Sequence, residues 1–422
     1  MSSERLIGVI GSGTMGAGIA EASAAAGFVV QTLDTNPELV KSAYAKVGQR
    51  LDERVARGKL PRHDRDATMS RLKVATGYDD LRDAECVIEA VPEDLALKNK
   101  ILAELDKLAS PRMLLASNTS SLSIGKLGEG LSHAGRFLGM HFFNPAPVMK
   151  LIELVQGPAT DEQAMVDARA ICTKLDKTPV KVKDSPGFIG NRVNRPFYLE
   201  ALSLLESGEA DVRTIDAAVR TVGGFKMGPF ELLDLIGLDI NLKVTESVWA
   251  DFGKPSRFTP SAIQRKLVAE GHLGRKSKRG FYDYSGSEPV LAYESRPKDS
   301  SRWTPTPTLA AFAQALEKPS DRATWLYARV MLAVMNEASI VAETIALPRD
   351  VNLTMELGFN YPDGPLDVAD FVGLDVVLNL MKEIHRETAG SERFKPAPLL
   401  EKHVANGDLG EKTAQGFLHH WL

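Results

Sequence analysis

The feature of this chain that most constrains its fold is a glycine-rich turn set between an apolar run and an alanine-rich segment. Residues 11–16, Gly-Ser-Gly-Thr-Met-Gly, follow the apolar run Leu6–Ile10 and match the spacing G-x-G-x-x-G. Glycines at these three positions allow a tight turn from a strand into a helix, a close approach of the backbone to a ligand, and close packing of helix on strand. The turn therefore predicts a strand–turn–helix unit at the start of an α/β sheet.

A second apolar run, Val29–Asp34, ends in an acidic residue. A carboxylate here would accept hydrogen bonds from a dinucleotide ribose, while the positive end of the first helix would stabilise the diphosphate. No arginine follows Asp34 to hold a 2′-phosphate, which favours NAD over NADP. A flavin dinucleotide is the competing ligand, although nothing later in the sequence indicates a site for its isoalloxazine ring. The other alternative is a turn that binds no ligand and only packs a helix on a sheet. The predicted NAD-binding residues here are Gly11, Gly13, Thr14, Met15, Gly16 and Asp34.

Short apolar runs separated by segments of helical length continue through the first half of the chain. Beyond the first two, they lie at residues 86–91, 113–117, 137–140, 151–156 and 178–183. This alternation predicts a parallel sheet covered by helices on both faces, and we expect the last two runs to extend the same sheet. The sequence thus indicates an α/β, Rossmann-type doubly wound domain over residues 1–186.

The second half of the chain is helical in pattern and repeats itself. Two segments recur with an offset of 136 residues: GPFELLDLIGLD at 228–239 as GPLDVADFVGLD at 364–375, and RKSKRGFYDY at 275–284 as EKTAQGFLHH at 411–420. Glu200 and Glu337 correspond with an offset of 137, so a gap of one residue aligns the copies. We therefore expect two tandem all-α domains, at 187–290 and 321–422, joined by a linker at 291–320.

Composition excludes several classes of protein. At roughly 150 residues per domain, 422 residues suggest two to four domains. Charges are nearly balanced, with 51 Lys and Arg against 55 Asp and Glu, so we expect neither a nucleic-acid partner nor a membrane surface. The sequence has no signal-peptide pattern and no metal-ligand pattern, and Cys86 and Cys172 lie in apolar surroundings typical of buried free thiols. We expect a cytoplasmic protein without a metal.

Three polar motifs lie where the carboxyl ends of the strands should converge. They are SNTSSLSI at 117–124, GMHFFNP and its continuation at 139–155, and DSPGFIGNRV at 184–193. Of the eight histidines, His141 alone combines the end of a strand with an acid, Glu153, on the following one. His141 is therefore the leading candidate for an acid–base role; its alternative is to cap a strand end. Glu153 has the alternative of a surface strand position, and Asn191 that of a helix N-cap.

These motifs, in this order and over nearly the whole chain, resemble the 3-hydroxyacyl-CoA dehydrogenase family. The resemblance implies NAD-dependent oxidation of the 3-hydroxyl of a (3S)-3-hydroxyacyl-CoA to 3-oxoacyl-CoA. It assigns His141 and Glu153 as the catalytic pair, and Ser120 and Asn191 as polar groups around the reacting oxygen. Further cofactor contacts implied by the resemblance are Glu93 and Lys98 at the nicotinamide end, with Asn118, Ser120 and Asn144.

The chemistry of this reaction agrees with those side chains. A secondary alcohol needs a base for its proton and an acceptor for the hydride on C3, and neutral imidazole titrates near physiological pH. A carboxylate on the far ring nitrogen fixes the tautomer and stabilises the imidazolium, which suits Glu153 beside His141. Ser120 and Asn191 would position the substrate oxygens. The thioester is not attacked, so no nucleophilic serine or cysteine is required.

The duplicated helical region and the segment ERVARGKL resemble the bacterial branch that acts on 3-hydroxyadipyl-CoA or 3-hydroxybutyryl-CoA, in β-oxidation of fatty acids or phenylacetate catabolism. Arg54, Arg57 and Lys59 are candidates for gripping the CoA phosphates, with a solvated helix face as the alternative. Arg192 and Arg195 are candidates for holding a terminal carboxylate of the acyl chain. No hydratase segment precedes the glycine turn, so we do not expect the large bifunctional enzyme.

The second helical copy has Ala328 where the first has Asn191, and we expect it to be catalytically silent. We expect a homodimer of two-copy chains, with a monomeric pseudo-dimer as the alternative. Two other functions remain open. A 3-hydroxyacid dehydrogenase acting on a free acid would use a lysine base where this chain has Asn191 and Arg192, and a crystallin-like or regulatory NAD-binding protein would have a broken His–Glu pair.

Overall fold

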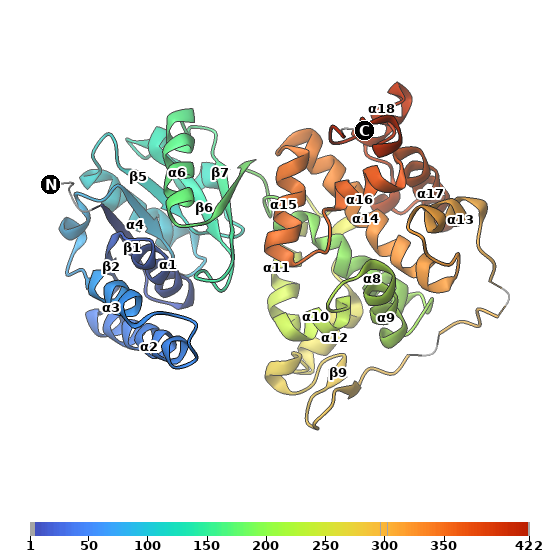
Figure 1. Ribbon diagram of the computed structural model, residues 1–422, viewed down its shortest axis with the longest axis horizontal. Coiled ribbons are helices and arrows are strands. Elements are labelled where there is room, and N and C mark those ends of the chain that lie inside the picture. Colours follow the sequence, from blue (N-terminus) through green and yellow to red (C-terminus); the bar gives the residue numbers. More distant parts are fainter. Residues whose placement is uncertain (1–4, 296, 302, 421–422) are drawn as a thin grey trace. The chain divides into compact units, whose positions relative to one another are not determined.

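The computed structural model describes residues 5–295, 297–301 and 303–420, which fall into two compact units divided between Phe188 and Ile189 (Figure 1). The first unit is a sheet with helices, and the second is helical. Within the described residues, no helix is long and apolar enough to cross a membrane. Cys86 and Cys172 are buried free thiols, as expected, and burial raises the pKa of Cys86 to about 12.

Eight strands form one sheet in the described part of the first unit, in the order β3-β2-β1-β4-β5-β6-β7-β8. Their bounds are β1 Leu6–Ile10, β2 Val29–Leu33, β3 Leu72–Val74, β4 Cys86–Glu89, β5 Leu114–Ser117, β6 Phe137–Phe142, β7 Leu151–Gln156 and β8 Thr178–Lys183. All seven predicted strands are present, and the Rossmann-type architecture is confirmed. The short strand β3 was not predicted, because its three residues follow a helix directly and form no apolar run of their own.

The expectation of a wholly parallel sheet is wrong at one pair of strands. β6 and β7 are antiparallel, whereas the other neighbours in the sheet are parallel. Only residues 143–150 join these two strands, and a parallel crossover needs roughly a dozen residues or more. The chain therefore turns straight back, and the turn brings residues of the two strands directly opposite one another.

The helices of the first unit cover both faces of the sheet, and several of them begin at a capping side chain. They are α1 Thr14–Ala25, α2 Pro37–Ala56, α3 Arg62–Arg71, α4 Leu95–Leu108, α5 Ile124–Gly128 and α6 Glu162–Lys174. Asn36 caps α2, with Pro37 in its first turn, and Asp94 caps α4 through the amide of Leu97. Because β4, β5 and β6 are buried along their whole length, the core lies on both sides of the central strands.

The second unit contains both helical copies. The first copy runs from α7 Gly190–Val193 through α8 Arg195–Glu206, α9 Val212–Gly223, α10 Pro229–Ile236 and α11 Leu238–Asp251 to α12 Ala262–Ala269. The second comprises α14 Arg322–Thr344, α15 Pro348–Phe359, α16 Pro365–Val372, α17 Leu374–Glu387 and α18 Pro398–Asn406. The first copy ends with the short strand β9 Tyr282–Asp283, which pairs with β10 Val290–Leu291, and a helix, α13 Pro307–Ala315, lies between the copies. The stretch that we expected as a linker thus includes α13, which packs on α17.

The two copies face each other with reciprocal contacts. Helix α14 of the second copy packs on α8 and α9 of the first. Arg192 of the first copy pairs with Glu337 of the second at 2.6 Å, while Arg329 of the second pairs with Glu200 of the first. Because Arg192 corresponds to Arg329 and Glu200 to Glu337 with the same offset of 137 residues, the interface has the self-complementary form of a two-fold dimer.

Candidate active site

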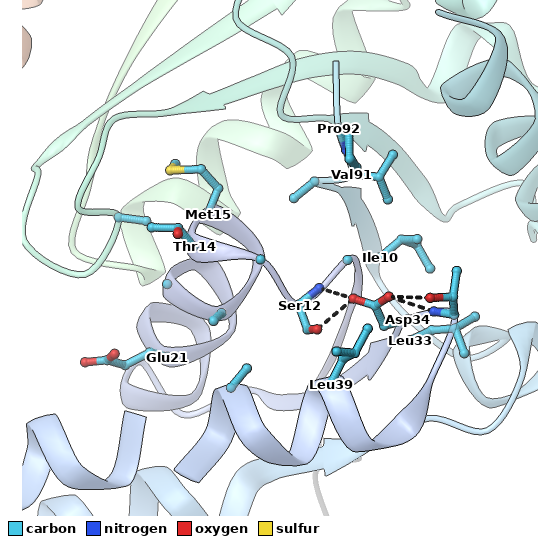
Figure 2. Close-up of a pocket in the computed structure, with 18 of the residues that line it drawn as sticks. Ile10, Ser12, Thr14, Met15, Glu21, Leu33, Asp34, Leu39, Val91 and Pro92 are labelled. Atoms are coloured by element: carbon cyan, nitrogen blue, oxygen red, sulfur yellow. Dashed lines mark hydrogen bonds between the residues drawn. The ribbon is translucent and has the colours of Figure 1, made fainter. Parts of the chain in front are cut away.

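The glycine turn lines a cavity of about 1930 Å³ in the first unit (Figure 2). Gly11 has φ +97°, and a Cβ on Gly16 would lie 1.9 Å from the carbonyl oxygen of Gly11, so both positions require glycine. A Cβ on Gly13 would instead meet nothing within 4 Å, which leaves open space for ligand atoms beside the backbone. This is the local geometry that the sequence predicts for dinucleotide binding.

The first turn of α1 presents backbone N–H groups to the same cavity. Its N-cap is Gly13, which has no side chain to bond those groups, and Thr14 and Met15 line the cavity. A helix start of this kind attracts an anion such as a diphosphate, through its unpaired N–H groups and its dipole. The residues present therefore fit the diphosphate of NAD.

Asp34 lies at the end of β2 with its carboxylate held by four hydrogen bonds, two of them visible from Ser12 in Figure 2. Ser12 donates its backbone N–H at 2.7 Å and its hydroxyl at 2.6 Å to one oxygen, and Thr35 donates to the other. Burial alone would raise the pKa of Asp34, but these hydrogen bonds outweigh it and the pKa lies below its usual value. The carboxylate is thus charged and fixed on the cavity wall, ready to accept from a ribose hydroxyl.

A chain of three charged side chains, two of them buried, supports the loop after β5. Lys98 is 1% exposed, and its ammonium contacts Glu89 at 2.8 Å and Glu93 at 3.2 Å. The Glu93 carboxylate accepts from the Thr119 hydroxyl at 2.6 Å and from the backbone N–H of Ser120 at 3.0 Å. Lys98 is therefore enclosed by acids, and its effect on the predicted nicotinamide end passes through Glu93 to this loop. Glu89 was not predicted from sequence, because a buried acid at a strand end has no pattern of its own.

Two asparagines lie beside this loop. The side-chain oxygen of Asn118 accepts from the backbone N–H of Phe142 at 2.9 Å, which ties the end of β5 to the end of β6. Asn144 lines the cavity two residues after β6. Both therefore belong to the carboxyl edge of the sheet, where their predicted cofactor contacts remain predictions.

His141 and Glu153 form a direct pair across the antiparallel turn. They are register partners on β6 and β7, and the ring Nδ1 of His141 lies 2.7 Å from a carboxylate oxygen of Glu153. Glu153 is fully buried and His141 is 8% exposed, with the rings of Phe143 and Phe188 beside it at 4.7 and 5.9 Å. With Nδ1 held by the carboxylate, a neutral imidazole keeps Nε2 as a proton acceptor.

The three residues predicted to contact CoA do not all line the cavity. Arg54 lines the cavity, whereas Arg57 and Lys59 are exposed and are not among its lining residues. The structure adds Arg50 and Lys46 to that wall, one and two turns before Arg54 on α2. Their spacing of four residues is the sequence signal that could have found them.

The remaining predicted residues belong to the second unit. Asn191 lies in α7 and its neighbour Arg192 pairs with Glu337. Arg195 is 3% exposed; its guanidinium donates to the carbonyl of Asn191 at 2.9 Å and to the Thr245 hydroxyl at 3.1 Å. Among the described residues, Arg192 thus has a carboxylate partner and Arg195 has none in ion-pair contact.

Ala328, the counterpart of Asn191, is buried in α14 and carries no polar group. No cluster of three or more His, Cys, Asp or Glu side chains that could hold a metal ion occurs in the described ranges.

Comparison with known proteins gives consistent matches. Residues 6–185 match the NAD-binding domain of 3-hydroxyacyl-CoA dehydrogenase, and residues 187–284 and 325–420 both match its C-terminal domain. A 3-hydroxyadipyl-CoA dehydrogenase of Escherichia coli is 35% identical over 96% of this chain and 98% of that protein. A 3-hydroxybutyryl-CoA dehydrogenase of Bradyrhizobium diazoefficiens is 39% identical over 67% of this chain and 97% of that protein. The solved structure of an Escherichia coli 3-hydroxybutyryl-CoA dehydrogenase matches with a TM-score of 0.85 at 34% identity, covering 96% of this chain and 99% of that one.

Proposed function

The chain belongs to the 3-hydroxyacyl-CoA dehydrogenase family, and we propose that it interconverts a (3S)-3-hydroxyacyl-CoA and its 3-oxoacyl-CoA with His141 as the acid–base residue. The observation that carries the proposal is the 2.7 Å contact between His141 and Glu153. His141 lies near the carboxyl end of β6, the same edge of the sheet at which β1 leads into the glycine turn. Ligands of open α/β sheets bind at this edge.

In the proposed reaction, Nε2 of His141 takes the proton of the 3-hydroxyl while Glu153 holds Nδ1 and stabilises the imidazolium that forms. Bound NAD supplies the acceptor for the hydride that leaves C3. In the reverse direction, His141 returns the proton to the developing alkoxide. Ser120 and Asn191 would hold the substrate oxygens, a positioning effect worth several kcal/mol in favourable cases.

The substrate is proposed to be a CoA thioester. Arg54 and Lys46 offer positive charge along one wall of the cavity, which suits the phosphates of CoA, whereas Arg50 between them is paired with Glu21 at 2.6 Å. Arg57 and Lys59 would contribute at longer range from their exposed positions. The negative ligand and the cationic helix face are complementary in charge.

For the acyl group we favour 3-hydroxyadipyl-CoA, with 3-hydroxybutyryl-CoA as the alternative. Relatives with both names match this chain. Arg195 supports the first: no carboxylate among the described residues pairs with its buried guanidinium, and a buried charge is costly unless an anion, here from a ligand, lies beside it. A terminal carboxylate of the acyl chain would do so.

The two other functions are less well supported. A non-enzymatic NAD-binding protein would have no need of a buried His–Glu pair in contact at 2.7 Å. A free-acid dehydrogenase of the wider fold would use a lysine where α7 carries Asn191 and Arg192.

For the assembly we propose a monomeric pseudo-dimer, the alternative to the homodimer expected from sequence. The reciprocal pairs of Arg192 with Glu337 and of Arg329 with Glu200 already fill a two-fold type of interface inside one chain. A cytoplasmic location is supported by the two buried free cysteines.

The test is NADH oxidation with acetoacetyl-CoA, comparing the wild type with His141→Gln. The proposal predicts turnover by the wild type and its collapse in the variant, while both bind NADH with similar affinity by fluorescence titration. A wild type that binds NADH but turns over neither this substrate nor a panel of 3-hydroxyacyl-CoAs would point to a non-enzymatic function.

A further inference from the structure

We propose that the second helical copy, although it has Ala328 in place of Asn191, holds the Asn191 turn of the first copy (the short helix α7, Gly190–Val193, with Asn194 after it) in its working position. Glu337 is then the positioning residue. The inference rests on the proposed role of Asn191 at the substrate oxygen. It gives the catalytically silent copy a function in the reaction of the other.

Glu337 forms an ion pair with Arg192, the residue next to Asn191. Its carboxylate contacts the guanidinium of Arg192 at 2.6 Å through one oxygen and that of Arg257 at 3.0 Å through the other. The side chains of Arg192 and Glu337 are each almost completely buried, and the Arg192 guanidinium also lies over the ring of Phe252. The ion pair and the aromatic ring together hold the Arg192 side chain in one orientation, and the backbone of the neighbouring Asn191 is held with it.

The second copy also holds the turn on its other two sides. A Cβ on Gly190, the residue before Asn191, would lie 2.5 Å from the ring of Phe359 at the end of α15. Three residues after Asn191, the side-chain oxygen of Asn194 accepts a hydrogen bond from the Tyr361 hydroxyl at 2.9 Å. Contacts with the second copy therefore occur before, beside and after Asn191.

The alternative is that these contacts only stabilise the packing of the two copies. Stability alone does not call for a buried ion pair, because apolar side chains of similar volume often serve as well or better. A buried pair does fix geometry, since each charge has one well-satisfied position. The location of this pair next to a proposed substrate residue favours a positioning role.

The chain contains its own matched control. Glu200 contacts Arg329 with one oxygen and Arg393 with the other, as Glu337 contacts Arg192 and Arg257. The position next to Arg329 is the buried, apolar Ala328. Removing the charge of Glu200 therefore disturbs the interface to the same degree without freeing a substrate residue.

The experiment compares Glu337→Gln with Glu200→Gln, with Asn191→Ala as the reference, in the assay with acetoacetyl-CoA and NADH. We expect both glutamine variants to lower Tm by similar amounts. Of the two, only Glu337→Gln should lower kcat/KM for the acyl-CoA, by about 10-fold or more, as expected for a lost positioning contact. The loss should divide between kcat and KM in the same proportion as in Asn191→Ala. The KM for NADH should stay within twofold of wild type in all three.

The outcomes separate the two proposals. If Asn191→Ala impairs turnover but Glu337→Gln behaves like Glu200→Gln, the positioning role is wrong and the proposed function stands. If Asn191→Ala has no effect, the role of Asn191 itself fails.

A second pair of variants covers the case in which Glu337→Gln does not fold. Gly190→Ala places a methyl group against Phe359, and we expect it to lower kcat/KM. Phe359→Ala in the same chain should restore much of the loss. Failure of this rescue, with Tm recovered, would overturn the proposed support of the turn by the second copy.

Discussion

Replacing Glu153 by glutamine removes the charge that orients His141 and changes little else in shape. The carboxylate is fully buried and its contact with Nδ1 is 2.7 Å, so no water can take its place without rearrangement. A hydrogen bond to a charged group contributes about 1.5–3 kcal/mol, and each 1.4 kcal/mol is about tenfold in rate, so its loss alone costs roughly 10- to 150-fold in kcat.

Glutamine adds a second effect on the tautomer. Its amide can donate to Nδ1, which would leave the proton of His141 on Nε2, where it cannot act as the base. With this effect, we expect kcat to fall by about 10³-fold or more, the range seen when the orienting carboxylate of a catalytic histidine becomes an amide.

The assay is steady-state NADH oxidation with acetoacetyl-CoA, with NADH affinity measured separately. Glu162→Gln is the control, because Glu162 pairs with Lys181 on the exposed side of β8 and lies away from the histidine. A Glu153→Gln variant that keeps more than a tenth of the wild-type kcat would refute the orienting role.

Gly16→Ala would place a methyl group 1.9 Å from the Gly11 carbonyl oxygen, so we expect NADH affinity to fall by 10-fold or more in a fluorescence titration, and unchanged affinity would contradict the proposed diphosphate site. Burial raises the pKa of Asp216 to about 7, so the stability that its protonated form contributes is fully present below pH 4 and is lost as the pH rises through 7. Tm should therefore fall between pH 4 and pH 7. Asp216→Asn should flatten this fall, since Asn352 already occupies the corresponding position in the second copy. Arg195→Met should lower kcat/KM for 3-hydroxyadipyl-CoA at least 10-fold more than for 3-hydroxybutyryl-CoA, and an equal loss for both would remove the argument for a terminal carboxylate.

Much of the first unit could be predicted from sequence because its signals are local. Apolar runs mark buried strands, and within the glycine turn the positive φ of Gly11 and the close approach of Gly16 to the Gly11 carbonyl oxygen require glycine. The direction of β7 was missed, since periodicity identifies a strand but not its orientation. The length of the connection over 143–150 carried that information.

In the candidate site, too, contacts between successive strands could be predicted from sequence, whereas contacts that depend on the folded environment could not. The pairing of His141 with Glu153 could be predicted as a histidine and an acid on successive strands, and the register makes them direct neighbours. The burial of Lys98 between Glu89 and Glu93 could not, because burial of a lysine depends on partners that fold around it. The contacts of Arg192 with Glu337 were also beyond reach, since they join residues 145 positions apart.

The central claim is that the hydride leaves C3 of a 3-hydroxyacyl-CoA and is accepted by NAD. The most direct measurement uses (3S)-3-hydroxybutyryl-CoA and 3-hydroxyadipyl-CoA labelled with deuterium at C3, with mass analysis of the nicotinamide product. The account predicts NADH heavier by one deuterium, formed together with 3-oxoacyl-CoA by the wild type and not by His141→Gln. Bound NAD that gains no deuterium from either substrate would contradict it.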